Sequence, residues 1–244
     1  TETVTEAVPY AENAKIFPLN DCYLVFLDNG QETFVLKSSK AGFDFSSFSL
    51  GEIVDVFDYG NYFKIFYNAT DGYGISDLSK TDFTVNKTIF VSSATLNCII
   101  PFVENGKQIY LAAESDNGLY IRKFYSDLSP SSSDRKKIGS ATLLGHGADN
   151  TNMYLCLTGG INGIVTVRTN LTLSYSLNKT TAVISKIYDR AFDNNTFTHL
   201  VSDGDGKSVT IKISENGSET SYYDATDNAA LLAYPNGTFG IAYN

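Results

Sequence analysis

The sequence is poor in the residue types that most often carry chemistry. Its 244 residues include two His, three Cys, one Met and no Trp. Lys and Arg together number 18 against 27 Asp and Glu, which gives a formal net charge of −9. Nucleic-acid binding depends on Lys and Arg that neutralise phosphates, and no basic patch with interleaved aromatic residues is present. The composition therefore argues against a nucleic-acid partner.

Long hydrophobic runs are also missing. No apolar stretch approaches the roughly 18 residues of a membrane-spanning helix, so we expect no membrane span within these residues. Cys22, Cys98 and Cys156 form no Cys-x-x-Cys pair, which disfavours a thiolate metal site, and we expect small buried thiols rather than a disulfide with one cysteine left over. The chain begins at Thr1 without a signal-peptide pattern, which fits a mature chain whose leader was removed and fits a fragment equally.

The most informative feature is a repeat. Five Asx-Gly pairs recur at steps of 42, 46, 45 and 43 residues, counted between the glycines: Asn29-Gly30, Asp71-Gly72, Asn117-Gly118, Asn162-Gly163 and Asp205-Gly206. Each pair stands between two runs of β-forming residues. Asx-Gly is a strong hairpin signal because both central residues of a type I′ turn need a positive φ, so we expect such a turn at each pair. A period of this length is typical of four-stranded propeller blades.

The residues around each pair define the rest of the unit. A short, more apolar run precedes each hairpin and a weaker, polar run follows it, which gives the order inner strand, two hairpin strands, outer strand. The expected inner strands are 15–19, 52–57, 98–102, 141–144, 183–188 and 229–233. No stretch carries a helical apolar period over three turns, and Tyr and Phe number 16 each. The prediction is an all-β protein with little or no helix.

These units predict one β-propeller domain, residues 1–244, of about six four-stranded blades. The approximate blade units are 15–50, 51–95, 96–140, 141–180, 181–226 and, for an incomplete last blade, 227–244 plus 1–10. Our first expectation is that residues 1–8 form the strand that closes the last blade. The alternatives are that this strand completes the last blade of a neighbouring molecule, or that the polypeptide continues into further strands.

Glycosylation sequons are the second signal. Seven Asn-x-Ser/Thr sequons occur, at Asn68, Asn86, Asn170, Asn178, Asn194, Asn216 and Asn236. We expect them at turns or strand ends, where a bulky glycan would be held in solvent, and none inside an inner strand. Chance placement is the alternative. The sequons predict an N-glycosylated protein that is secreted and works outside the cell or at its surface.

Candidate catalytic groups are few. His146 and His199 are expected to be packed or solvent-facing imidazoles, and no Ser-His-Asp triad follows from their spacing. Glu52, Asp55 and Asp189 lie on or beside expected inner strands and are the candidates for a carboxylate pair of the glycoside-hydrolase type, with solvated carboxylates as the simpler interpretation. We expect no enzyme activity and no cofactor apart from N-linked glycans.

One glycine-rich stretch is similar to part of a calcium loop. Asp203 and Asp205 alternate with glycines there, but a third acidic position and a downstream Glu are missing, so a hairpin turn is preferred and no metal is expected. The stretch also differs from the Asp box of sialidase propellers. That box ends in Trp, which this chain lacks.

A broader resemblance covers almost the whole chain. The run IIPFVENGKQIYL (99–111), followed by SDNGLY (115–120), is similar to surface-protein propeller repeats with an inner strand, a Gly turn, an aromatic strand and a Ser-Asp-Gly hairpin. Such repeats are found in extracellular adhesive or scaffold proteins, and the resemblance implies that class. It supplies no catalytic residue.

Two functional hypotheses follow. The first is a non-enzymatic, N-glycosylated extracellular structural subunit that assembles with copies of itself into a fibril or surface coat. The second is a monomeric propeller that binds glycans or surface proteins through loops at one face. In the second, Tyr10, Tyr59, Tyr188 and Tyr234 near the inner strands are the candidates for stacking on sugars, with core or rim packing as the simpler role.

Overall fold

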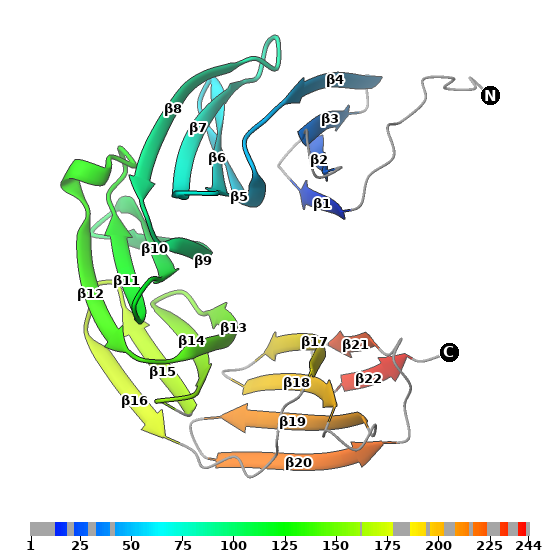
Figure 1. Ribbon diagram of the computed structural model, residues 1–244, viewed down its shortest axis with the longest axis vertical. Coiled ribbons are helices and arrows are strands. Elements are labelled where there is room, and N and C mark those ends of the chain that lie inside the picture. The colour runs from blue at the N-terminus through cyan, green and yellow to red at the C-terminus, as the bar shows by residue number, and fades with distance from the viewer. Residues whose placement is uncertain are drawn as a thin grey trace. The chain divides into compact units, whose positions relative to one another are not determined.

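The fold consists of antiparallel sheets that follow one another along the chain (Figure 1). The structure is a computed structural model and describes residues 13–18, 22–28, 33–39, 42–161, 163–177, 186–193, 196–202, 208–214, 217–223, 230–233 and 239–242. The chain divides into two compact units, residues 1–99 and 100–244, which are described separately.

The first unit contains two four-stranded sheets, each with its strands in chain order. The first sheet comprises β1 (Asn13–Pro18), β2 (Cys22–Asp28), β3 (Thr33–Ser39) and β4 (Gly42–Phe48). The second comprises β5 (Glu52–Tyr59), β6 (Tyr62–Ala69), β7 (Gly72–Ser79) and β8 (Val85–Ser92). Both sheets contribute to one hydrophobic core, in which Leu24 and Phe26 of the first sheet pack with Ile65 and Leu78 of the second.

The second unit begins within β9 (Thr95–Glu104), the first strand of the third sheet. That sheet continues with β10 (Lys107–Ser115), β11 (Leu119–Phe124) and β12 (Asp134–Gly139). The fourth sheet comprises β13 (Thr142–Ala148), β14 (Asn152–Thr158), β15 (Gly163–Arg168) and β16 (Leu173–Leu177). The fifth comprises β17 (Lys186–Asp193), β18 (Thr196–Ser202), β19 (Ser208–Ser214) and β20 (Gly217–Tyr223), and β21 (Ala230–Ala233) pairs with β22 (Phe239–Ala242) in a two-stranded sheet.

The all-β prediction is confirmed. The predicted order of four consecutive antiparallel strands is confirmed as well, in each of the five four-stranded sheets among the described residues. A single 3-10 turn, η1 (Pro130–Ser132), is the one helical element among the described residues. No helix in the described part of the chain is long and apolar enough to cross a membrane. Residues 1–8, the expected closing strand, lie outside the described residues.

The middle strands of the sheets, rather than the inner strands, are the most buried. All of 109–114 in β10 and all of 153–157 in β14 are buried, whereas β5 and β13 alternate between buried and more exposed positions. A strand that is buried on both faces is mostly apolar, and β10 departs from this pattern only at the end of its buried run, at Glu114. The expected inner strands β5, β9 and β13 are therefore not the most buried strands of the second, third and fourth sheets.

Two of the Asx-Gly pairs, Asp71-Gly72 and Asn117-Gly118, lie at predicted hairpins but do not form the predicted turn, whereas Asn29-Gly30, Asn162 and Asp205-Gly206 lie outside the described residues. Asp71 and Asn117 do not have positive φ, whereas the glycines after them have φ of +138° at Gly72 and +153° at Gly118. A type I′ turn requires positive φ at both positions, and Asn105-Gly106, between β9 and β10, meets that requirement with φ of +50° and +73°. The prediction of type I′ turns at Asp71-Gly72 and Asn117-Gly118 is wrong.

At Gly72 and Gly118, the glycine is explained by close approach of the fourth strand of the same sheet. A Cβ on Gly72 would lie 2.0 Å from the carbonyl oxygen of Ser92 at the end of β8, and one on Gly118 would lie 3.0 Å from that of Gly139 at the end of β12. Gly163, with φ of +131°, pairs with the last residue of β16. The glycine thus serves the contact between the third and fourth strands rather than the turn itself.

A bulge recurs in the first strand of three sheets. The register of β5 against β6 shifts between Ile53 and Asp55, and β13 and β17 shift at the corresponding places, after Leu143 and Ile187. A bulge leaves one residue unpaired and redirects the side chains next to it. The predicted carboxylates Asp55 and Asp189 therefore occupy equivalent positions directly after a bulge.

Candidate functional site

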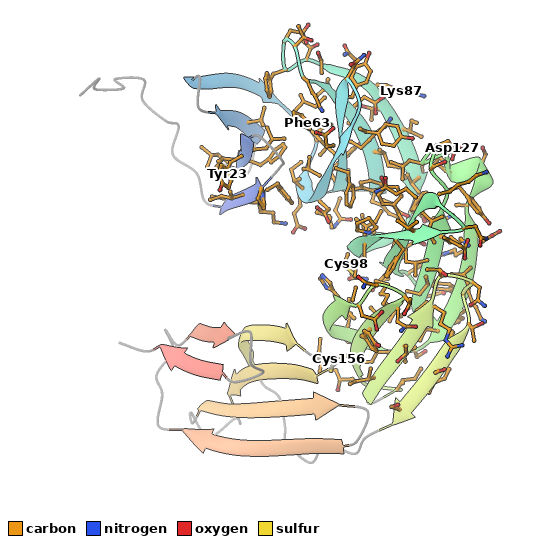
Figure 2. All side chains as sticks on the ribbon, turned by 180° about the vertical axis from the view of Figure 1, so that it is seen from behind. Tyr23, Phe63, Lys87, Cys98, Asp127 and Cys156 are labelled. Atoms are coloured by element: carbon orange, nitrogen blue, oxygen red, sulfur yellow. The ribbon has the colours of Figure 1, made fainter. Side chains whose placement is uncertain are left out.

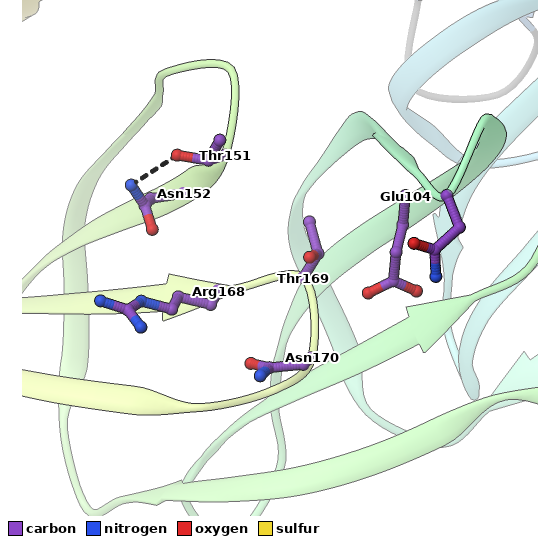
Figure 3. Close-up of a pocket in the computed structure, with 7 residues that line it drawn as sticks. Glu104, Thr151, Asn152, Arg168, Thr169 and Asn170 are labelled. Atoms are coloured by element: carbon purple, nitrogen blue, oxygen red, sulfur yellow. Dashed lines mark hydrogen bonds between the residues drawn. The ribbon is translucent and has the colours of Figure 1, made fainter.

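A polar pocket in the second unit is a candidate site. Its volume is about 520 Å³, and three connections between strands line it. Figure 3 shows Arg168 and Asn170 along one edge, Glu104 on one side, and Thr151 with Asn152 on the other. The complete lining consists of Glu104, Asn105, Thr151, Asn152, Arg168, Thr169 and Asn170. Carboxylate, guanidinium, amide and hydroxyl groups together provide donors and acceptors for a hydroxyl-rich molecule.

Glu104 is the fixed negative charge of the pocket. Its Oε2 lies 2.6 Å from Nζ of Lys123 in β11, and its side chain is 25% exposed. Hydrogen bonding from Lys123, assisted by a hydrogen bond from Thr169, lowers the pKa of Glu104 against a smaller opposing effect of burial. The carboxylate is therefore an acceptor at physiological pH rather than a proton donor.

The β13–β14 connection is fixed by a second carboxylate. Although burial of Asp149 acts to raise its pKa, hydrogen bonds from Tyr154, Thr151 and Asn152 outweigh it and hold the pKa well below the usual range. Oδ1 accepts the backbone N–H groups of Thr151 and Asn152 at 2.7 Å, and Oδ2 accepts the Tyr154 hydroxyl at 2.7 Å. Thr151 and Asn152 are thus held in place at the edge of the pocket before any ligand binds.

The opposite edge is a tight turn that carries a sequon. Oδ1 of Asn170 accepts the backbone N–H of Thr172 at 3.0 Å, and the N–H of Leu171 donates to the carbonyl of Arg168 at 2.9 Å. Leu171 has φ of +61°, and Nζ of Lys136 donates to its carbonyl at 2.8 Å. Local bonds of this kind define an Asx turn, so the position of the Asn170 side chain is fixed.

The described sequons differ in their surroundings. Asn86 in β8 is exposed, and Asn170 is exposed at its turn. Asn68 is half-buried in β6, and its amide pairs with the backbone of Leu96 through both polar atoms, at 2.8 and 3.0 Å. The expectation that each sequon holds its side chain in solvent is thus wrong for Asn68. The other four sequons, Asn178, Asn194, Asn216 and Asn236, lie outside the described residues.

The predicted carboxylates are not assembled into a pair. Burial raises the pKa of Asp55 to about 6, against the opposing effects of the Val56 N–H, which donates to Oδ1 at 2.7 Å, and of the Lys15 charge. Glu52 is 65% exposed and bonds to Lys15 at 3.0 Å. The side chain of Asp189 is not among those described. Glu52 thus pairs with Lys15, and Asp55 is a half-buried side chain in β5.

The remaining predicted residues fall at separate places. His146 lies within β13 rather than after it, is half-buried and pairs with Leu155, while His199 is an interior residue of β18. Tyr59, the last residue of β5, is half-buried and has Nζ of Lys64 at 5.2 Å from its ring centroid. Tyr188 lies at the bulge of β17, with its side chain not described. Tyr10, Tyr234, Asp203 and Asp205 lie outside the described residues.

The two cysteines with described side chains, Cys98 and Cys156, are buried and form no disulfide. Cys98 is 4% exposed and Cys156 is fully buried (Figure 2). Burial raises the pKa of Cys156 to about 12, so its thiol stays protonated and unreactive. The prediction of buried thiols is confirmed for these two, while the side chain of Cys22 is not described. Within the described residues, no group of three or more His, Cys, Asp or Glu side chains could hold a metal ion.

The pocket was not found from the sequence. Its seven lining residues come from three connections that are distant in sequence, and the alignment of the repeats gave no signal that these connections meet. The only sequence signal at the site was the sequon at Asn170. A comparison of turn positions between neighbouring sheets would have placed Asn105 and Thr151 in equivalent loops, between the first and second strands, without showing the pocket itself.

No protein-family model matches this chain, and a search of curated proteins found no relative. Solved structures with a similar fold do exist. BBS1N in complex with ARL6DN superposes with a TM-score of 0.57 at 10% identity, over 98% of this chain and 75% of that one. Dihydro-heme d1 dehydrogenase NirN superposes with a TM-score of 0.54 at 13% identity, over 90% of this chain and 50% of that one.

Raptor from Chaetomium thermophilum superposes with a TM-score of 0.52 at 12% identity, over 91% of this chain. The chain spans 22% of Raptor and half of NirN. One of these similar structures carries an enzyme name, so the fold by itself does not decide between an enzyme and a binding protein. At these identities the similarity concerns the fold alone, and together with the four-stranded sheets it identifies a β-propeller of several blades.

Proposed function

We propose that this chain is a non-enzymatic, N-glycosylated extracellular structural subunit that assembles with copies of itself. The sheet formed by β21 and β22 supports this proposal, because it has two strands among the described residues where each of the other sheets has four. A sheet edge presents N–H and C=O groups that a strand from another chain can pair with. Residues 1–8 of a second copy are the proposed partner strand.

The exposed positions of Asn86 and Asn170 fit the glycosylated part of the proposal. Glycans at these positions would be carried without disturbing the core, because neither asparagine contributes to the buried cluster. The net charge of −9 would keep such a protein soluble until it assembles.

Electron microscopy of the protein, secreted from a eukaryotic host and purified without denaturation, tests the proposal. Long polymers or sheets are the expected result, and discrete particles of one chain at all concentrations would contradict it. Val4→Pro removes a backbone N–H from the proposed partner strand and should stop assembly, whereas the matched variant Val4→Thr should assemble normally.

The polar pocket favours a second candidate function, binding of a hydroxyl-rich ligand such as a glycan. Arg168 and Glu104 provide an ionic donor and an ionic acceptor within one pocket of about 520 Å³. That volume lies in the range of roughly 300–1,000 Å³ that is usual for ligand sites. Saturable binding of one glycan class on an array, lost in Arg168→Ala, would support this function, and failure of all glycans to bind would count against it.

A further inference from the structure

One residue belongs both to the polar pocket and to a sequon. Asn170 lines the pocket, and Leu171 and Thr172 complete the sequon. The asparagine is exposed, and the part of the chain that the structure describes offers no partner for its amide nitrogen, which is the atom that an N-linked glycan would occupy. A sugar attached there would start at the edge of the pocket.

The turn fixes the direction in which that sugar would leave the protein. Arg168 and Thr172 close the turn, since the Arg168 N–H donates to the Thr172 carbonyl at 3.0 Å. Oδ1 of Asn170 is held by the Thr172 N–H, and Lys136 holds the carbonyl of Leu171 from the neighbouring sheet. Because few rotations remain free, ordering an attached glycan against the protein would cost less entropy than on a mobile loop.

The pocket lining suits the groups of an N-acetylhexosamine. Such a sugar presents several hydroxyls and one acetamide, each with a donor and an acceptor. Arg168 and the amide of Asn105 can donate to them, and the ionised Glu104 can accept from a hydroxyl. Thr151 and Asn152, already fixed by Asp149, form the far wall (Figure 3).

We propose that Asn170 carries an N-linked glycan whose first sugars lie in this pocket and are held by its polar lining. The glycan then covers the junction between the third and fourth sheets as a structural part of the protein. This inference rests on the glycosylated, extracellular character of the proposed function. It assigns the pocket to the chain's own glycan rather than to an external ligand.

The test compares Asn170 with Asn86, an exposed sequon on β8 that lines no described pocket. The full chain is secreted from a eukaryotic host with Asn178→Gln, so that the nearby sequon does not confuse the assignment. Mass spectrometry measures occupancy at both sites, and an amidase that removes N-glycans is applied to the folded protein. We expect both sites to be occupied and release at Asn170 to be about tenfold slower, the factor that 1.4 kcal/mol of packing free energy produces.

Two substitutions keep the comparison specific. Arg168→Ala removes a donor from the pocket and leaves the sequon intact, so it should speed release at Asn170 and leave Asn86 unchanged. Lys87→Ala is the matched control, because it removes an exposed cation beside Asn86 and also leaves its sequon intact. Once the protein is unfolded, the amidase should release the glycans of Asn170 and Asn86 at the same rate in every variant.

Three results would overturn the inference. If Asn170 carries no glycan while Asn86 does, no glycan lies in the pocket, and the proposed function is unaffected. Equal release rates from the folded protein show that the glycan does not contact the pocket. Glycans missing from every sequon overturn the proposed function and this inference together, so the two failures are distinguishable.

Discussion

The side-chain amide of Asn68 pairs with the backbone of Leu96 through both of its polar atoms. Nδ2 donates to the Leu96 carbonyl at 3.0 Å, and Oδ1 accepts the Leu96 N–H at 2.8 Å. Asn68 lies in the second sheet and Leu96 is the second residue of β9 in the third, so one side chain substitutes for a pair of ladder hydrogen bonds between strands that do not otherwise pair. A sequon asparagine is thereby a structural residue.

Substitution at Asn68 is expected to destabilise the protein whether or not a glycan is attached. Asn68→Gln moves the amide by one methylene and leaves the buried backbone groups of Leu96 without a partner, at a cost of about 1–3 kcal/mol in the free energy of unfolding. Thr70→Ala abolishes the same sequon without touching the amide. Denaturation by urea should show a lower free energy of unfolding for Asn68→Gln only. An equal decrease for Thr70→Ala would assign the effect to the glycan instead.

Gly72 should not tolerate a side chain. A Cβ there would overlap the backbone of Ser92 and Ser93, at 2.0 and 2.6 Å, and overpacking of this kind costs about 1–3 kcal/mol. The positive φ adds about 1–2 kcal/mol to that cost. Gly106→Ala is the control, because Gly106 also has positive φ but open space around it. Thermal unfolding should show the larger loss for Gly72→Ala, and equal losses would exclude the steric explanation of the repeat.

The raised pKa of Asp55 predicts that the free energy of unfolding depends on pH. Its pKa is about 6 in the folded chain, mainly through burial, and about 4 when unfolded, so the folded state binds more protons between these values. Stability should therefore fall as the pH rises from about 4 to 6, by about 2–3 kcal/mol in all, and stay level above that range as far as Asp55 is concerned.

The neutral variant Asp55→Asn isolates this effect. It keeps an oxygen that can accept the Val56 N–H but carries no charge, so it should be more stable than the parent at pH 7 and equally stable at pH 4. Urea denaturation of both proteins across this range provides the measurement. A difference that does not vary with pH would show that the carboxyl of Asp55 is not the titrating group.

The buried carboxylate of Glu114 depends on its two arginine partners. Glu114 is fully buried and bonds to Arg122 and to Arg135, the second at 2.9 Å. Arg122→Met leaves the charge with one partner and should cost about 3–5 kcal/mol, as expected when a buried ion pair loses one member.

The more exposed pair of Lys80 with Asp58 is the control for Glu114. Lys80→Met should cost no more than about 1 kcal/mol, because solvent screens that pair. Glu114→Gln combined with Arg122→Met should recover part of the loss, since the buried carboxylate charge is gone and Arg135, which is 30% exposed, keeps Asp116 at 3.7 Å. A double variant as unstable as the sum of both single variants would argue against the charge as the cause.

Much of the architecture could be read from the sequence, because blades are local structures. The strands of one sheet are consecutive, so the spacing of Asx-Gly pairs and the runs between them indicated where each hairpin lies. The predicted inner strands 52–57 and 98–102 fall within β5 and β9, and the run 15–19 overlaps β1. The candidate site was out of reach, since Glu104 ends a strand of the third sheet, whereas Thr151 and Asn170 lie in two separate connections of the fourth.

The sequence by itself determined the repeat, the strand order and the all-β composition, because these depend on hydrophobic alternation and turn residues that act over a few positions. Only the tertiary structure decided what individual residues do. Gly72 is required by a strand that follows 20 residues later, at Ser92. The side-chain amide of Asn68 is a structural group, and Asn170 lies at the edge of a pocket, although each begins an Asn-x-Thr sequon. Burial and hydrogen bonding between segments distant in sequence distinguish them, and no local pattern encodes those contacts.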